Sequence, residues 1–198
     1  MTYQFAEVAA PKGAPLLLLL HGTGGDERDL IGLGRQLMLE AHLVSPRGDV
    51  LEGGAPRFFR RLAMGVYDMD DLERATRKMA GFIRETAARV RPKTVTALGY
   101  SNGANILASV LFTSPDLVDR AVLMHPLIPF EPPQQPELSG RHVLITAGRR
   151  DAISPSSATQ GLADYFMDQG AVTELVWHDG GHELRPSEVA AAKAFLMA

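Results

Sequence analysis

Residues 94–103, Thr-Val-Thr-Ala-Leu-Gly-Tyr-Ser-Asn-Gly, decide the fold of this chain. The apolar run Thr94–Leu98 predicts a buried strand, and a helical pattern follows it at Asn102–Phe112. Between them lies the pattern G-x-S-x-G, which is typical of a sharp turn from a strand into a helix. Its two glycines let the strand and the helix approach closely, and its serine, Ser101, stands exposed at the turn. The alternative is a glycine-rich turn in which the serine only caps the helix.

Short apolar runs recur on both sides of this stretch and predict further buried strands. They lie at Leu16–Leu20, Leu43–Ser45, Ala121–Met124, Val143–Thr146 and Leu175–Trp177. Helical patterns alternate with them at Asp29–Met38, Asp70–Val90, Ser156–Met167 and Ser187–Leu196. Such alternation predicts an α/β fold: a mostly parallel central sheet with helices on both faces. The proline-rich segment from Pro126 to Pro136 predicts a surface loop, because proline cannot donate to a strand ladder.

Length and composition narrow the class of protein. The 198 residues predict a single domain spanning residues 1–198, with little or no chain left for a lid. The net charge of −3 argues against a nucleic-acid binder and against a basic membrane anchor. The absence of cysteine excludes disulfides and a thiolate nucleophile. The run Leu16–Leu20 is too short for a membrane span or a signal peptide, so we expect a cytoplasmic protein.

A serine hydroxyl becomes a nucleophile only when a base lies within hydrogen-bonding reach. His182 is the strongest candidate for that base, because its loop follows the strand ending at Trp177 and opens on the same sheet edge as Ser101. Four other histidines are weaker candidates. His125 and His178 lie close to strand ends. His42 and His142 are expected at the opposite edge of the sheet.

The base needs an acidic partner that orients it, and Asp151 directly follows the strand Val143–Thr146. Asp151 could instead cap the next helix or pair with a neighbouring arginine. Asp179 is a rival acid, but it stands in the same tight loop as His182. The order Ser101, Asp151, His182, each after a separate strand, is the chain order of an α/β-hydrolase triad.

The segment His21-Gly22-Thr23-Gly24-Gly25 follows the strand Leu16–Leu20 and offers backbone amides to a developing oxyanion. The amides of Thr23 and of Asn102, the residue after the serine, are the predicted pair of donors. A phosphate-binding loop is the alternative. No Walker lysine follows, and G-x-G-x-x-G is absent, so nucleotide binding is disfavoured.

Together, His21-Gly-Thr-Gly-Gly, Gly99-Tyr-Ser-Asn-Gly, Arg150-Asp151 and Gly181-His182 resemble the phospholipase/carboxylesterase family of α/β hydrolases. The similarity spans nearly the whole chain. Residues 45–48 and 57–61 further resemble its hydroquinone-responsive or copper-inducible hydrolase subgroup. The resemblance implies Ser101 as nucleophile, His182 as base and Asp151 as orienting acid, with no metal and no organic cofactor. The segment from His125 to Pro129 departs from the thioesterases of the family, so their acyl-chain preference is not transferred.

The sequence also suggests the walls of a substrate pocket. Phe58 and Phe59 are predicted to line it on one side, and Leu127 and Ile128 on the other. The arginines that flank the two phenylalanines could bind an anionic group of the substrate. Surface ion pairs with Asp68, Asp70 or Asp71 are the favoured interpretation, and each would contribute less than about 1 kcal/mol.

These observations predict a serine carboxylesterase that acts on short, soluble carboxylic esters through an acyl-enzyme on Ser101. One alternative is a lysophospholipase or acyl thioesterase for longer chains. Another is a non-catalytic protein that keeps the fold and binds aromatic ligands. The expected partner is a small-molecule ester, with no nucleic acid and no membrane. Apolar residues near 58–69 could support a homodimer.

Overall fold

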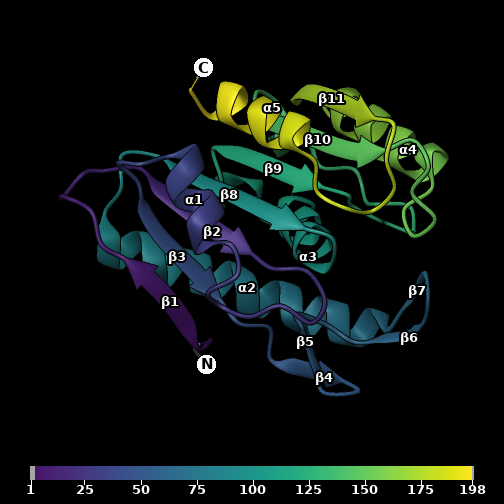
Figure 1. Ribbon diagram of the computed structural model, residues 1–198, viewed down its shortest axis with the longest axis horizontal. Helices are drawn as coiled ribbons and strands as arrows, with labels where there is room; N and C mark the ends of the chain where they lie inside the picture. Colours follow the sequence, from purple (N-terminus) through teal and green to yellow (C-terminus); the bar gives the residue numbers. More distant parts are fainter. Residues whose placement is uncertain (1–2, 198) are drawn as a thin grey trace.

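A computed structural model describes residues 3–197. Within them, a seven-stranded sheet crosses the molecule (Figure 1). Its strand pairs are all parallel except the one at its first edge, where β1 runs antiparallel to β3. In spatial order the strands are β1 (Phe5–Val8), β3 (His42–Pro46), β2 (Leu16–Leu20), β8 (Val95–Tyr100), β9 (Arg120–Met124), β10 (His142–Gly148) and β11 (Val172–His178).

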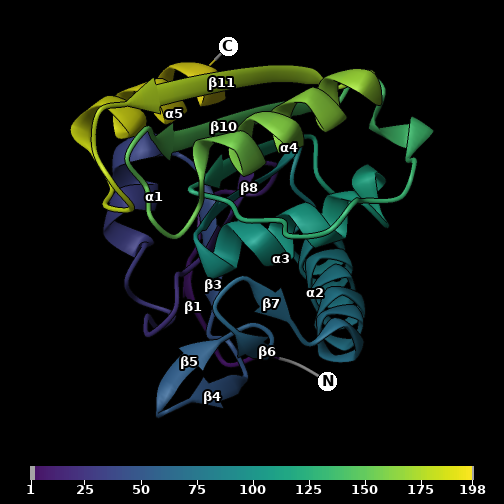
Figure 2. The same ribbon diagram turned by 90° about the vertical axis from the view of Figure 1, so that its right-hand side faces the viewer.

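Helices cover both faces of this sheet, as the alternating pattern predicts (Figures 1 and 2). One face carries α1 (Ile31–Leu37) and α5 (Pro186–Met197). The other carries α2 (Met69–Val90), α3 (Asn102–Leu111) and α4 (Ser156–Asp168). The mixed α/β architecture with a mostly parallel sheet is therefore confirmed.

The five leucines of β2 show why the strands of such a sheet are continuous apolar runs in the sequence. All five are fully buried. Side chains alternate between the two faces of a strand, so Leu16, Leu18 and Leu20 join the core under α2, α3 and α4. Leu17 and Leu19 join the core under α1 and α5. A strand that is covered on both faces is apolar on both, so its sequence does not alternate between polar and apolar residues.

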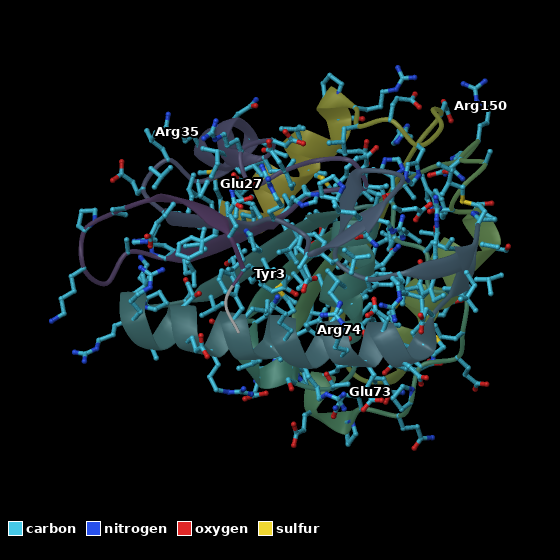
Figure 3. All side chains as sticks on the ribbon, turned by 90° about the horizontal axis from the view of Figure 1, so that it is seen from below. Tyr3, Glu27, Arg35, Glu73, Arg74 and Arg150 are labelled. Atoms are coloured by element: carbon cyan, nitrogen blue, oxygen red, sulfur yellow. The ribbon has the colours of Figure 1, made fainter. Side chains whose placement is uncertain are left out.

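Local interactions and backbone conformation fix both ends of the long helix α2. The side chain of Asp68 accepts a hydrogen bond from the backbone N–H of Asp71 and so caps its first turn. Arg91 ends it in the left-handed conformation. Glu73 and Arg74 are neighbours on this helix (Figure 3). Arg74 pairs within α2 with the buried Asp71 at 2.7 Å, and it also reaches Asp49, in the segment between His42–Pro46 and Val50–Glu52, at 3.2 Å.

Several short elements escape prediction. The edge strand β1 is one, and two small hairpins are the others: β4 (Val50–Glu52) with β5 (Ala55–Arg57), and β6 (Arg61–Ala63) with β7 (Val66–Tyr67). Strands of two to four residues are too short to show a period. Two 3₁₀ turns, η1 (Pro115–Leu117) and η2 (Pro136–Leu138), complete the fold. In the part of the chain that the structure describes, no helix is both long and apolar enough to cross a bilayer.

Candidate active site

The carboxyl edge of the sheet brings Ser101, Asp151 and His182 together from the ends of β8, β10 and β11. Ser101 Oγ lies 2.8 Å from His182 Nε2. On the other side of the ring, His182 Nδ1 lies 2.7 Å from Asp151 Oδ2. These distances place a hydroxyl, an imidazole and a carboxylate in one hydrogen-bonded line.

The backbone of the turn around Ser101 is strained. Ser101 has a φ of 52°, a left-handed value that a non-glycine residue seldom adopts. A Cβ on Gly99 would overlap the backbone of Gly103, and a Cβ on Gly103 would overlap the carbonyl of Leu20. The two glycines therefore let α3 begin directly against β8 and β2, with Ser101 at the apex.

The two loops that carry Asp151 and His182 are joined to each other by backbone hydrogen bonds. The backbone N–H of Arg149 donates to the carbonyl of His178 at 2.8 Å, and that of Arg150 to Gly180 at 2.9 Å. Arg150 itself points outward at one end of the molecule (Figure 3). A Cβ on Gly148 would overlap the backbone of Gly181, so the close approach of the loops depends on this glycine. Backbone bonds thus fix the separation of Asp151 and His182.

Asp151 is buried and its carboxylate is fully engaged. Its Oδ1 accepts from the N–H groups of Ile153 at 2.8 Å and Ser154 at 2.9 Å. Its Oδ2 faces the imidazoles of His182 and His125. Burial alone would favour the neutral acid, but these hydrogen bonds outweigh it and hold the pKa of Asp151 below its ordinary value. The group is therefore a carboxylate at neutral pH.

Asp179, the alternative candidate for the acid, lies away from the imidazole of His182. The side chain of Asp179 is 93% exposed, and its carboxylate lies 3.9 Å from the guanidinium of Arg149. It faces solvent, whereas Asp151 faces the imidazole.

The two predicted oxyanion donors, the amides of Thr23 and Asn102, belong to residues that line one cavity with Ser101. Among the described residues, neither amide donates to another backbone or side-chain group. Both residues are braced from β5 and the segment that follows it. Arg57 Nη1 donates to Thr23 Oγ1 at 2.7 Å, and the N–H of Phe58 donates to Asn102 Oδ1 at 2.8 Å.

The cavity beside Ser101 has a volume of about 250 Å³. Its lining mixes apolar and polar side chains, which include Met64, Tyr67, Asn105, Leu127 and Ile153. Leu127 lies there as predicted. Ile128 does not line this cavity and instead packs, half-buried, against the core. Tyr67 and Asn105 were not predicted to line the pocket, and they are linked by a hydrogen bond of 2.8 Å.

The prediction for Phe58 and Phe59 is wrong. Both rings are fully buried in the core and neither lines the cavity. Phe58 packs beside His21 and Tyr3, and Phe59 packs against Tyr67. The apolar pair serves to anchor the loop beneath the cavity, because burying two aromatic rings stabilises more than leaving them at a pocket wall.

The neighbouring arginines divide between two roles. Arg60 pairs with Asp68 at 3.0 Å and Asp71 at 3.5 Å, which is the predicted surface pairing. Arg57 and Arg61 line the cavity instead, and both pair with Glu52. The hairpins that hold them were not predicted, so their position was not accessible from sequence.

A second buried cluster adjoins the site and contains His125, His178 and Glu188. Its spacing would suit a metal ion, but the donor chemistry does not. The N–H of Gly180 donates to His178 Nδ1 at 2.9 Å, so the proton of that ring sits on Nε2, which lies 3.2 Å from Glu188 Oε2. A protonated ring nitrogen cannot ligate a metal.

Comparisons with known proteins identify the family and the fold of the chain. Residues 58–192 match the model of the dienelactone hydrolase family. MhqD of Bacillus subtilis (strain 168) is 45% identical over 180 residues, which cover 90% of each chain. The protein Atu2452 of Agrobacterium tumefaciens, of unknown function, is 52% identical with a TM-score of 0.92, covering 98% of this chain and 96% of that one. The carboxylesterase of Bacillus cereus is 40% identical with a TM-score of 0.90, covering 99% and 92%. The chain therefore belongs to the dienelactone hydrolase family and has the α/β-hydrolase fold.

Proposed function

We propose that this hydrolase is a serine carboxylesterase that cleaves short carboxylic esters through an acyl-enzyme on Ser101. The observation that carries the proposal is the line Ser101–His182–Asp151, which opens onto a cavity of about 250 Å³. The carboxylesterase of Bacillus cereus, with 40% identity and the same fold, supports the choice of ester over other substrates.

The first half of the reaction forms the acyl-enzyme. Ser101 Oγ attacks the ester carbonyl while His182 Nε2 takes its proton. Asp151 holds the ring in the tautomer with the proton on Nδ1 and stabilises the imidazolium that forms. The amides of Thr23 and Asn102 receive the developing oxyanion. His182 then gives the proton to the departing alcohol.

The second half reverses the roles. Water enters where the alcohol left, and His182 removes a proton from it as the water attacks the acyl carbon. The second oxyanion collapses, Ser101 regains its proton from His182, and the carboxylic acid leaves. Every atom and proton is accounted for by the three side chains and one water, so the cycle requires no metal or organic cofactor.

The size of the cavity sets the expected substrate range. Sites for drug-sized ligands occupy about 300–1,000 Å³, and this cavity is smaller. A short acyl group fits beside Ser101, whereas a long chain would have to extend beyond the cavity. The open approach and the small volume favour a soluble ester over a lipid.

Turnover of p-nitrophenyl esters from acetate through butyrate and octanoate to palmitate tests this proposal. We expect kcat/KM to be greatest for acetate or butyrate and at least about 100-fold lower for palmitate. The Ser101→Ala variant supplies the background rate. A maximum at octanoate or palmitate would indicate a lysophospholipase or thioesterase, and folded protein without turnover of any ester would indicate a binding protein.

A further inference from the structure

The buried cluster beside the site continues the line of charged groups beyond Asp151. His125 Nδ1 lies 3.0 Å from Asp151 Oδ2, the same oxygen that faces His182. Its other nitrogen, Nε2, lies 3.0 Å from Glu188 Oε1. His125 and both carboxylate side chains are fully buried. A single imidazole therefore stands between two carboxylates that are closed to solvent.

The hydrogen bonds around the carboxylates determine where the protons are. Glu188 Oε1 accepts from Thr146 Oγ1 at 2.6 Å, and Oε2 accepts from the N–H of Arg185 at 2.8 Å. Both oxygens of Glu188 are thus acceptors, as both oxygens of Asp151 are. A neutral imidazole at His125 would place an unprotonated ring nitrogen 3.0 Å from an oxygen of one carboxylate, which is repulsive. The doubly protonated ring instead donates from Nδ1 to Asp151 and faces Glu188 with a positive charge at ion-pair distance, although its Nε2–H is not aligned for a hydrogen bond.

We propose that His125 is a positioning residue which carries a constant positive charge between Asp151 and Glu188, and which thereby keeps His182 unprotonated and ready to act as base. The claim that His125 acts on His182 as the base rests on the proposed function. The rings of His125 and His182 are 5.1 Å apart, so a cation on one disfavours a cation on the other.

The energetics agree with this charge state. Burial opposes a charge on His125, but the contacts with Glu188 and Asp151 outweigh it and raise its pKa. Burial likewise opposes ionisation of Glu188, and its contacts with His125 and Thr146 outweigh that and lower its pKa. A charged carboxylate on both sides and a charged ring between them is the one assignment consistent with all three directions.

The titratable side chains that face His125 come from several elements of the fold. Asp151 comes from the end of β10, Glu188 from α5, and His182 from the loop after β11. His178, at the end of β11, accepts a hydrogen bond at Nδ1 from the backbone N–H of Gly180. Tyr100 of β8 stands edge-on to the ring, burial raises its pKa, and its hydroxyl donates to the carbonyl of His182. Among the described residues of this cluster, no lysine or arginine supplies a positive charge between Asp151 and Glu188.

The backbone at His125 is also strained to achieve the placement. Its φ is 52°, a value it shares with Ser101. Its N–H donates to the carbonyl of Thr146 at 2.8 Å, and its carbonyl accepts from Ser154 Oγ at 3.3 Å. A non-glycine residue held in this region is strained, and the surrounding contacts must offset that strain. These contacts therefore fix the backbone position of His125.

The charge state is tested first, without substrate. Protein labelled with ¹⁵N-histidine is examined by long-range imidazole NMR from about pH 5.5 to about pH 9, the range in which an ordinary histidine titrates. We expect both ring nitrogens of His125 to stay protonated throughout. In Glu188→Gln, which removes one carboxylate and leaves the Asp151 pair, the ring should titrate within that range. A wild-type His125 with one protonated nitrogen at pH 7 overturns the proposal.

The effect on the base is tested by the pH–rate profile of His125→Gln. Loss of the cation should move the inflection to higher pH, because Asp151 then favours the positively charged side chain without opposition from a neighbouring cation. His42→Gln is the matched control, since His42 also faces a carboxylate, Glu7, but at the opposite edge. A purely structural role would lower stability and leave the inflection in place, and that result contradicts the proposal.

The two tests separate this inference from the proposed function. A doubly protonated His125 in a protein that cleaves no ester would refute the hydrolysis and leave the charge assignment standing. An active esterase with an unshifted inflection in folded His125→Gln would refute the role of His125 and leave the triad standing. If His125→Gln does not fold, the NMR titration of wild type and Glu188→Gln decides the charge assignment by itself.

Discussion

Asp151→Asn is expected to lower kcat/KM for a short ester by about four orders of magnitude while the protein stays folded. The amide keeps one oxygen for the N–H groups of Ile153 and Ser154, so the loop retains its hydrogen bonds. It cannot accept from His182 Nδ1 and stabilise an imidazolium as a carboxylate does. The ring then adopts the wrong tautomer for taking the proton of Ser101.

Steady-state kinetics with circular dichroism on the same preparation measures this effect. Asp179→Asn is the matched control, because Asp179 is the other acid near His182 in sequence and its side chain is 93% exposed. We expect this control to stay within about twofold of wild type. If the two variants exchange their behaviour, Asp179 is the orienting acid and the assignment of Asp151 fails.

Gly103→Ala should lower the free energy of unfolding by about 3 kcal/mol or more and remove activity together with it. The new Cβ would overlap the carbonyl of Leu20 in β2, and backbone cannot yield as a flexible side chain can. To relieve the overlap, α3 must move away from the sheet and carry Ser101 with it. A loss of this size corresponds to a fall in Tm of roughly 6–12 °C.

The control for this prediction is Gly81→Ala, the same change within another helix. A Cβ on Gly81 meets nothing within 4 Å, and alanine favours a helix over glycine by about 0.5–1 kcal/mol. Gly81→Ala should therefore be as stable as wild type or more stable, with full activity. Thermal unfolding of both variants makes the comparison, and a Gly103→Ala protein with wild-type Tm and rate would show that the close approach at the turn is unnecessary.

The core of the fold could be predicted because it depends on long apolar runs and on one turn. The five leucines of β2 and the pattern around Ser101 each carry a strong local signal. The order of Ser101, Asp151 and His182 after separate strands then placed three side chains at one edge of a parallel sheet, where the structure brings them within hydrogen-bonding distance.

The walls of the cavity could not be predicted, because they come from hairpins of two or three residues per strand. Phe58 and Phe59 illustrate the difficulty. Their apolar character was evident, but whether they face the cavity or the core depends on a register that those hairpins set. The role of His125 was equally hidden. Its sequence position at a strand end gave no sign that Glu188, 63 residues later on α5, would face its ring.

Labelling with a fluorophosphonate probe tests the central claim most directly, because the probe reacts only with a serine that is activated and has a working oxyanion site. Wild type and Ser101→Ala are treated side by side and read by intact mass. The account predicts one adduct on wild type and none on Ser101→Ala. Absence of an adduct on folded wild type, or the same adduct on both proteins, would contradict it.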